Sequence, residues 1–561
     1  MESESPSKSK LQIIGLIHNP RMLKIIITTN LVVISSIIII GGYFIFRQLS
    51  IVRFSSSFFT VVFDCGSTGT RVNVYKWMVK SPNEHNGELP VLLHSFPENL
   101  TKNNGCQYHC MQTEPGLHNF VGNASGVRTS LEPLINYAEQ WVPLERRGIT
   151  PIYVMATAGM RSLAVEDANR VMEDAENVVK EHGFLYGKKW IKVFSGKEEA
   201  YYGWVALNYK MGVFGNSSRS STLGLLDLGG SSLQVVAEVE DSVENEHVFR
   251  SKIGFVEHDI IAFSLPAFGL NEAFDQTIVM LSHTQELRES IRGRFEVRHP
   301  CLGAGFLQNY TCHGCFGLES LDSRESGNLS IRVQENELKT LLLVGKPNWE
   351  QCKVLARAAA INSSNSEWLH QAYHSNCIGL FSYRGKESFN LTKSSRSVRR
   401  YHALSGFFAI SNALNLNERA NLTKMWESGQ QLCSRSWADQ TSINGQYCFR
   451  VPYLASLIEN ALCLSGMEII FGPGDISWTL GAALVEGEFL WLNNKKSENG
   501  FLTLKNEEMI SSPILVFAAL LILLFIVYYS KIKLPMPGTG RKVAAANVSL
   551  PSYLCPKRQP N

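Results

Sequence analysis

Two short loops of the same design, far apart in the chain, constrain its fold more than any other feature. One reads DCGSTGTR at residues 64–71 and the other DLGGSSLQ at residues 227–234, and runs of β-branched and apolar residues flank both. This pattern predicts a strand, a tight turn and a second strand at each place. Glycines let the backbone approach a ligand, successive N–H groups bind anions, and a leading Asp can hold a hydrated cation. The pair therefore predicts a duplicated fold that grips a polyphosphate and its metal ion between two halves.

The length of the chain requires more than one hydrophobic core. A chain of 561 residues is expected to form at least two domains. Its formal net charge of +3, with no basic stripe interleaved with aromatic residues, argues against a nucleic-acid partner.

Two apolar segments near the ends predict transmembrane helices, at residues 23–46 and 510–529. The first is longer than the core of a signal peptide and has no evident cleavage site, which favours a retained anchor. A buried core helix is the alternative for both. Lys and Arg residues precede the first segment and follow the second, so the tails at 1–22 and 530–561 are expected in the cytosol. Whether the spans also hold a homo-oligomer together stays open.

The region between these segments has the marks of a lumenal or extracellular domain. It contains eight Asn-x-Ser/Thr glycosylation acceptors, at Asn99, Asn123, Asn216, Asn309, Asn328, Asn362, Asn390 and Asn421. Apart from Cys65 it has ten cysteines, an even number that suits disulfides in an oxidising compartment. Close spacing predicts disulfide-closed loops at Cys106/Cys110 and Cys433/Cys448, while the pairing of the central cysteines stays open. The alternative is a zinc site at Cys312 and Cys315 with His299 or His313, which no second CxxC completes.

The order of elements predicts an α/β protein with two lobes. Residues 56–195 alternate strands and helices, including a helix at 164–181. Residues 196–474 form the second lobe, and residues 475–500 are expected to pack back on the first. Within the second lobe, residues 281–400 are expected to be surface elaboration rather than core. Two later stretches, 401–415 and 453–465, have helical apolar spacing.

Five motifs occur in a fixed order along this region. They are DCGSTGTR (64–71), ATAGMR (156–161), SGKEEAYYGWVALNY (195–209), LLDLGGSSLQ (225–234) and SWTLGAAL (477–484). In order, spacing and content they resemble the motifs of nucleoside triphosphate diphosphohydrolases, the apyrase family. The resemblance implies two RNase H-like lobes of the actin, hexokinase and heat-shock-70 type, with an active site between the lobes.

The resemblance also implies a role for each loop residue. Asp64 and Asp227 would hold Ca²⁺ or Mg²⁺ through water, and the cation would offset charge on the leaving phosphate. The residues that would bind phosphate or nucleotide are Ser67, Thr68, Gly69 and Arg71 in the first loop, Gly229, Gly230, Ser231, Ser232 and Gln234 in the second, and Trp478. For Trp478, simple core packing is the alternative.

Catalysis would depend on a water molecule and a carboxylate. The resemblance assigns the general base to Glu199 and gives Thr157 a share in holding the attacking water. The alternative for Glu199 is a solvated helix carboxylate. Three positions depart from the family pattern, namely Cys65, Ala200 and Leu233; they lie outside the charged positions and put rate and substrate preference in doubt. Tyr401, Phe407 and Phe408 fall in the region that binds the base in relatives, but the base stays unassigned.

These inferences predict a membrane-anchored glycoprotein that uses a divalent cation to hydrolyse terminal phosphates of nucleoside tri- and/or diphosphates. Its catalytic domain would face the lumen of the secretory pathway or the cell exterior. A lumenal nucleoside diphosphatase that supports glycosylation is one alternative. A non-catalytic nucleotide-binding ectodomain is another.

Overall fold

The computed structural model describes most of the chain between residues 57 and 492. The described residues are 37, 41, 57–78, 89–97, 111–215, 221–239, 248–254, 256–284, 288–289, 295–312, 339–361, 377, 398, 400–435 and 445–492. The chain divides into two units, 1–492 and 493–561, and the second unit has no described residue. The spans expected at 23–46 and 510–529 lie outside the described residues, except for Ile37 and Gly41. In the described part of the chain, no helix combines the length and the apolar character needed to cross a membrane.

The first half of the described chain forms a mixed sheet around a largely buried central strand. The sheet has the order β3-β2-β1-β5-β6, with β4 paired to β2. Its strands are β1 (Ser57–Cys65), β2 (Thr70–Met78), β3 (Val91–Phe96), β4 (Gln112–Thr113), β5 (Ile152–Ala156) and β6 (Ile191–Val193). Val61, Val62 and Phe63 of β1 are fully buried because helices cover the sheet on both faces. β1 is antiparallel to β2 and parallel to β5, so β1 and β5 end at the same edge.

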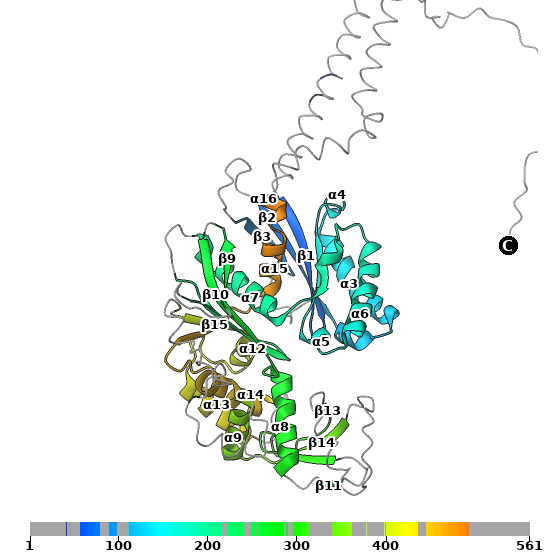
Figure 1. The fold of residues 1–561 in the computed structure, drawn as a ribbon. Helices are drawn as coiled ribbons and strands as arrows, with labels where there is room; N and C mark the ends of the chain where they lie inside the picture. Colours follow the sequence, from blue (N-terminus) through cyan, green and yellow to red (C-terminus); the bar gives the residue numbers. More distant parts are fainter. Residues whose placement is uncertain are drawn as a thin grey trace, which may run out of the picture. The chain divides into compact units, whose positions relative to one another are not determined.

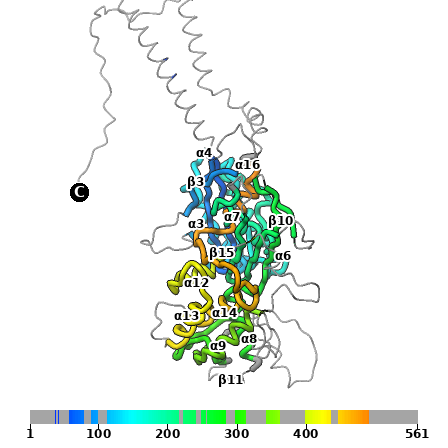
Figure 2. The backbone as a smooth tube through the Cα atoms, turned by 90° about the vertical axis from the view of Figure 1, so that its left-hand side faces the viewer, coloured from blue at the N-terminus to red at the C-terminus, as the bar shows by residue number. Residues whose placement is uncertain are grey.

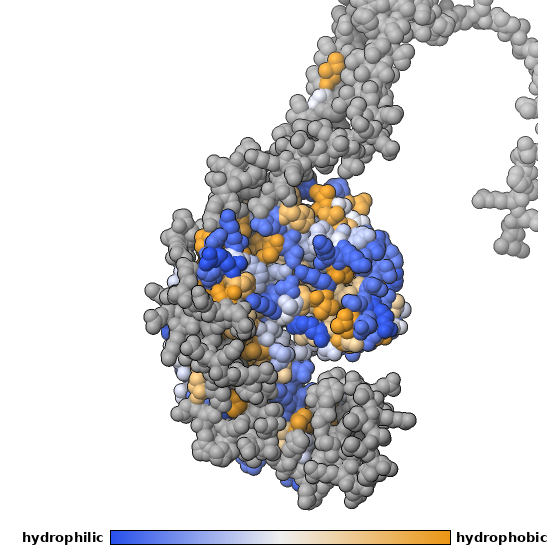
Figure 3. Space-filling model, in the orientation of Figure 1, coloured by the Kyte–Doolittle hydropathy of each residue, from blue (hydrophilic) through white to orange (hydrophobic). Residues whose placement is uncertain are grey.

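Two amphipathic helices cover the outer face of this sheet. They are α3 (Ala124–Trp141) and α6 (Val165–Lys180), and they pack against each other beside β1 (Figure 1). The helix predicted at 164–181 is confirmed by α6, whose buried side chains recur at helical spacing. On the face shown in Figure 3, the outer surface of this helical layer is largely hydrophilic.

A second mixed sheet repeats the central pattern. It has the order β16-β15-β7-β8-β10-β9. Its strands are β7 (Gly224–Leu228), β8 (Ser232–Glu238), β9 (Val248–Ile253), β10 (Val256–Pro266), β15 (Arg400–Ser405) and β16 (Glu468–Phe471). Here β7 is antiparallel to β8 and parallel to β15, which reproduces the relation of β1 to β2 and β5.

Two helices lie between the sheets and join them. α7 (Gly196–Lys210) contacts β7, β8 and β10, while α15 (Trp478–Glu486) contacts β1 and β2 (Figure 1). The helices touch closely at Gly481, where a Cβ atom would lie 1.9 Å from the Tyr202 carbonyl oxygen. The hydroxyls of Tyr75 on β2 and Thr479 on α15 share a buried 2.7 Å hydrogen bond. The C-terminal motif therefore contacts both α7 and the first sheet.

A further group of elements lies at the far side of the second sheet, as Figures 1 and 2 both show. They are α8 (Leu270–Thr284), α9 (Trp349–Ala360), α12 (Gly406–Ala413), α13 (Leu422–Ser434), α14 (Tyr447–Ser456), the π-helical turn Leu457–Ala461, and a small sheet of β11 (Arg288–Glu289), β12 (Phe295–His299), β13 (Leu307–Cys312) and β14 (Lys339–Gly345).

The prediction that residues 281–400 are surface elaboration is wrong for their described part. Val297, Leu341 and Leu355 are buried in the core of the second half, because β12 and α9 pack on α8, α9 packs on α14, and β14 pairs with β12. The helix predicted at 401–415 begins late: the chain forms β15 up to Ser405, since strand pairing with β7 and β16 overrides the helical spacing. The helical prediction at 453–465 is confirmed through Ala461.

Disulfides fix this second half. Cys433 and Cys448 are bonded as predicted, and the other described pairs are Cys301–Cys352 and Cys377–Cys463. Cys106 and Cys110 lie outside the described residues.

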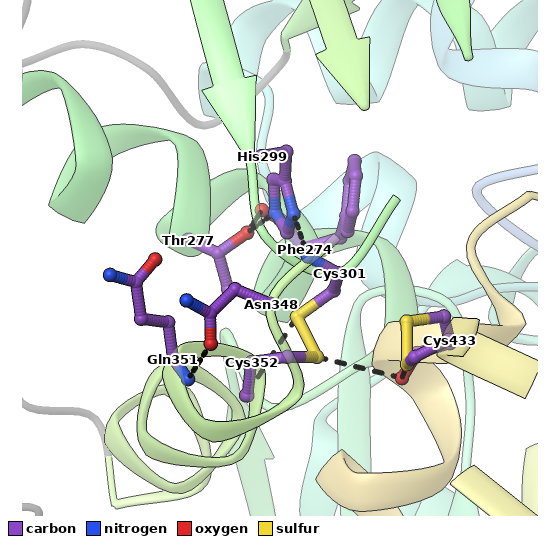
Figure 4. The surroundings of a disulfide bond; sticks show 9 residues. Phe274, Thr277, His299, Cys301, Asn348, Gln351, Cys352 and Cys433 are labelled. Carbon is purple, nitrogen blue, oxygen red and sulfur yellow. Dashed lines mark hydrogen bonds between the residues drawn. A yellow bond between two sulfur atoms is a disulfide. The ribbon is translucent and has the colours of Figure 1, made fainter. Parts of the chain in front are cut away.

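The alternative of a zinc site is wrong, because Cys312 is disulfide-bonded and both ring nitrogens of His299 are occupied. His299 accepts a hydrogen bond from the Cys301 N–H and shares another with the Thr277 hydroxyl (Figure 4). Burial lowers the pKa of His299 to about 3, so the ring is neutral and stacks on Phe274.

Candidate active site

The two Gly-rich loops are structural copies of each other. The first joins β1 to β2 and the second joins β7 to β8, so both strand–turn–strand predictions are confirmed. Asp64 pairs with Arg71 across the first hairpin, and Asp227 pairs with Gln234 across the second. The turns also close in the same way. The Gly66 N–H donates to the Gly69 carbonyl at 3.0 Å, and the Gly229 N–H donates to the Ser232 carbonyl at 2.9 Å.

The copies face each other closely enough to share a ligand. A Cβ atom at Gly230 would lie 3.5 Å from Ser67 Oγ and 3.8 Å from the Thr68 methyl carbon. Glycine is needed at Gly269, where a Cβ would meet the Gly230 carbonyl group and the Ser231 nitrogen within 2.3 Å. The start of α8 therefore packs directly on the second turn, where the Leu270 and Asn271 N–H groups donate to the Gly229 and Gly230 carbonyls.

The first metal candidate, Asp64, is buried beside an arginine. Nη1 of Arg71 donates to its carboxylate at 3.3 Å. Burial raises the pKa of Asp64, and the Arg71 charge and hydrogen bond oppose that effect. Arg71 also donates to Gln112 at 3.0 Å and to the Thr68 hydroxyl at 3.3 Å, so its guanidinium is fixed at the mouth of the loop.

The second metal candidate, Asp227, lies within electrostatic reach of the first. Burial raises its pKa, the hydrogen bond from the Ser405 side chain opposes the rise, and the Asp64 charge adds to it. Two desolvated carboxylates that repel each other are an arrangement that positive charge stabilises. Oxygen donors of this kind suit a hard divalent cation such as Ca²⁺ or Mg²⁺, so these residues fit the expected ion.

The structure separates the roles of the two adjacent glutamates on α7. Glu198 belongs to a capping box: its carboxylate accepts from the Ser195 N–H at 2.8 Å, and the Ser195 side chain accepts from the Glu198 N–H. Glu199, whose side chain is 12% exposed, accepts instead from Nη2 of Arg161 at 2.8 Å. It is therefore not the solvated helix carboxylate of the alternative interpretation.

The charge environment of Glu199 suits a group that takes up a proton near neutrality. Burial raises its pKa to about 7, the ion pair with Arg161 opposes this rise, and the charges of Asp64 and Asp227 add to it. Glu199 is therefore within electrostatic reach of both aspartates. A raised pKa from burial combined with specific charged neighbours is typical of functional sites.

Arg161 is a site residue that the sequence interpretation missed. It ends the ATAGMR motif, and its Nη1 donates to the Phe194 carbonyl at 3.0 Å while Nη2 holds Glu199. Its position as the basic residue that ends a motif was the available signal.

Thr157 lies where β5 ends, beside the first loop. Its N–H donates to the Cys65 carbonyl at 3.1 Å, and its buried hydroxyl lies 3.4 Å from the same oxygen. The parallel pairing of β1 and β5 thus brings Thr157 to the edge that carries Asp64.

The second loop is held by hydrogen bonds to a strand. Nε2 of Gln234 donates to Ser232 Oγ at 2.8 Å and to Ser264 Oγ on β10 at 3.1 Å. Trp478 is 6% exposed and its ring lies 4.9 Å from that of Phe194, so it packs in the core between the sheets. Contact between Trp478 and a nucleotide stays a prediction.

The three departures from the motif pattern all face the core. Cys65, Ala200 and Leu233 are buried, and burial raises the pKa of the Cys65 thiol well above its usual range. Cys65 is therefore an inert thiol in the folded protein. Tyr401 and Phe407 are also fully buried, which leaves Phe408 as the more accessible of the three aromatic residues considered for base binding.

Comparisons with known proteins agree with this geometry. A family model described as the GDA1/CD39 (nucleoside phosphatase) family matches residues 52–496. "Probable apyrase 7" of Arabidopsis thaliana is 35% identical over 87% of this chain, and the match spans 64% of that relative's length. "Nucleoside-diphosphatase mig-23" of Caenorhabditis elegans is 23% identical over 83% of this chain and 84% of its own length.

A solved structure of nucleoside triphosphate hydrolases from Neospora caninum has a similar fold. It covers 82% of this chain and 98% of its own with a TM-score of 0.52, at 15% sequence identity. This likeness supports the mixed α/β fold alone.

Proposed function

Since the chain belongs to the GDA1/CD39 (nucleoside phosphatase) family, we propose that it hydrolyses the terminal phosphate of nucleoside tri- and/or diphosphates. The observation that carries the proposal is the meeting of two copied loops, each with a leading aspartate, at a glutamate whose pKa both aspartates influence. We interpret the two main sheets as the RNase H-like lobes of an actin-like fold.

The residues present suit a direct attack of water on phosphorus. The turn N–H groups and the hydroxyls of Ser67, Thr68, Ser231 and Ser232 would bind the phosphate chain. A divalent cation held through water by Asp64 and Asp227 would supply charge compensation. Such a transfer depends on positioning and charge rather than on a covalent intermediate.

Glu199 would accept the proton of the attacking water. Arg161 fixes its carboxylate by a 2.8 Å hydrogen bond, and a pKa near 7 lets it accept a proton at neutral pH. Thr157 would orient the same water from the end of β5. Glu198 cannot replace Glu199, because its carboxylate is bound to the helix cap.

We further propose that the protein is a glycosylated integral membrane protein with its catalytic domain in the lumen or outside the cell. The sequons, the disulfides and the apolar segments at 23–46 and 510–529 support this placement. Pairing of the spans in a homo-oligomer stays a hypothesis.

The main alternative is that the protein hydrolyses only nucleoside diphosphates in the secretory lumen. The Caenorhabditis elegans relative, which is named a nucleoside-diphosphatase, supports this alternative. The test is phosphate release by the purified full-length chain across nucleoside tri- and diphosphates, with chelator and then with Ca²⁺ or Mg²⁺ restored. Turnover of both classes supports the proposal, and turnover of diphosphates alone supports the alternative.

A matched pair of variants tests the mechanism. Glu199→Ala should bind nucleotide but lose roughly two or more decades of turnover, as deletion of a general base typically does. Glu198→Gln should retain most activity. Nucleotide binding with no hydrolysis by the unaltered chain would instead indicate a non-catalytic binding domain.

A further inference from the structure

The short helix α4 (Leu144–Arg147) carries a large apolar side chain that the fold leaves uncovered. Leu144 is 75% exposed, while Trp141 before the helix and Ile149 after it are 42% and 49% exposed. Single exposed apolar residues are ordinary on protein surfaces, but here three large ones occur within residues 141–149. We call residues 141–149 the α4 tip.

Contacts on its inner side fix the α4 tip to the first sheet. The Trp141 ring stacks on Phe96 of β3, with ring centroids 4.0 Å apart. The guanidinium of Arg146 donates a hydrogen bond to the carbonyl of Ser57, the first residue of β1. The exposed leucine and isoleucine are therefore carried by backbone that the sheet holds in place.

The hydrogen bond between Arg146 and Ser57 places the α4 tip where the chain enters the first sheet. Only residues 47–56 separate Ser57 from the apolar segment at 23–46. Fully extended, these residues span at most about 35 Å. If the segment crosses a bilayer, as proposed above, the start of β1 and the tip beside it stay within this short reach of the membrane surface.

The last described element lies at the same end of the first sheet. It is α16 (Phe489–Leu492), and the Phe489 ring stacks on Trp190 with centroids 5.6 Å apart. The Trp190 ring lies 5.2 Å from that of Tyr153, near the start of β5. Figures 1 and 2 both show α4 and α16 at one end of the described fold. The chain therefore leads toward both apolar segments from the end that carries the α4 tip.

The glycosylation acceptors leave this end free. The sequence has no acceptor between Asn123 and Asn216, a stretch that includes the α4 tip. Asn123 caps the start of α3, whose 18 residues rise about 27 Å before the helix ends at Trp141. Asn309 on β13 and Asn421 at the start of α13 belong to elements at the opposite end in Figure 1. A bulky glycan would hold a surface away from a bilayer, and these positions avoid that conflict.

We propose that the α4 tip docks on the phospholipid bilayer that holds the two apolar segments, with Leu144 and Ile149 inserted among the headgroups. The proposal rests on the proposed membrane placement and goes beyond it by naming the face that touches lipid. Tryptophan and leucine side chains partition into the boundary between headgroups and acyl chains, so the composition of the tip suits this partner.

The test places a fluorescent dye on the α4 tip of the full-length chain. Leu144→Cys is made together with Cys555→Ser, labelled with nitrobenzoxadiazole and reconstituted in phosphatidylcholine vesicles. In a second set of vesicles, part of the lipid carries a nitroxide near the headgroup, which quenches a dye that touches the lipid. The dye at position 144 should lose fluorescence in the nitroxide vesicles. The matched control is Leu307→Cys on β13, which is 65% exposed and should show no loss.

A second variant tests the apolar side chain itself. With the dye at position 149, in Ile149→Cys, the addition of Leu144→Glu should reduce quenching by the lipid nitroxide, because a charged side chain opposes insertion. Leu144 is exposed, so Leu144→Glu should leave the thermal melt in detergent unchanged.

Equal fluorescence at position 144 in the two kinds of vesicle, from a chain that resists extraction by alkaline carbonate, would overturn the proposal while the membrane placement stands. A dye at position 144 that is shielded from an aqueous quencher but not quenched by the lipid nitroxide would also overturn it, and would indicate a protein partner. A chain that does not insert would overturn the placement and this proposal together. Phosphate release is a separate measurement, so the proposed hydrolysis stands or fails independently of these outcomes.

Discussion

Replacing Arg161 by Met should move the acid limb of the pH–rate profile to higher pH. Arg161 donates to Glu199 at 2.8 Å in a site where the Glu199 side chain is 12% exposed, and this ion pair opposes the rise of the Glu199 pKa to about 7. An adjacent arginine typically lowers a carboxyl pKa by about 1–3 units, so its loss should raise the Glu199 pKa by roughly 2 units. A general base must be unprotonated to act, so activity falls below its pKa.

The size of the effect follows from the fraction of ionised Glu199. At pH about 7.5, a pKa of about 7 leaves roughly three quarters of the base ionised, and a pKa of about 9 leaves roughly 3%. The expected loss near neutral pH is about 25-fold, and most of it should be recovered by pH about 9.5. A cation near Asp64 and Asp227 offsets their charge and lowers the Glu199 pKa. It does so in the unaltered chain and in Arg161→Met alike, so the acid limbs of both profiles move to lower pH and the difference between them remains.

The assay is kcat/KM for nucleotide hydrolysis from about pH 5.5 to 9.5 at saturating cation. Arg161→Lys keeps the positive charge and should shift the limb less. Glu198→Gln, which alters the capped neighbour, should not shift it. Lower activity of Arg161→Met with an unmoved acid limb would refute the reasoning, because Arg161 would then act on something other than the Glu199 pKa.

Three further predictions concern stability. The pKa of Glu199 is about 7 in the folded chain against 4.5 in an unfolded chain, so the folded state binds this proton more tightly. Without cation, the free energy of unfolding should therefore fall by about 3 kcal/mol as pH rises between these two values. Glu199→Gln should remove this fall from the curve of unfolding free energy against pH. Loss of the Cys433–Cys448 bond, which closes a loop with a sequence separation of 15, should cost about 3 kcal/mol by urea unfolding of the double Ala variant, and equal midpoints would contradict this. Gly481→Ala should cost about 1–3 kcal/mol or more, because its Cβ would collide with the Tyr202 carbonyl, whereas Gly148→Ala enters open space and should be nearly neutral in the same thermal melts.

The loops were predictable from sequence because each hairpin is built from one contiguous segment. Asp64, Asp227 and the glycines after them lie in contiguous motifs, and short strands on either side force a tight turn. The roles of Glu199 and Thr157 came from the resemblance, and the structure adds the reason that Glu198 is excluded, which is its capping box.

What the sequence concealed depends on contacts between distant segments. Residues 401–405 look like the start of an apolar helix, but pairing with β7 makes them strand β15 and puts Leu404 opposite Asp227. The buried strands β12 and β14 lie in a stretch rich in cysteines and sequons, where composition suggests surface. Neither the Cys301–Cys352 bond nor the Arg161–Glu199 pair follows from spacing, because both join elements that only the fold brings together.

The charges of the proposed site should link cation binding to the protonation of Glu199. Three carboxylates, Asp64, Asp227 and Glu199, face two arginines, Arg71 and Arg161, and the two aspartates raise the Glu199 pKa. Positive charge placed at the aspartates removes part of that rise, so cation binding should favour the ionised base. By linkage, ionisation of Glu199 should strengthen cation binding by the same factor. Mg²⁺ affinity measured with a nucleotide analogue should therefore increase from pH about 6 to 8, and this increase should shrink in Glu199→Gln.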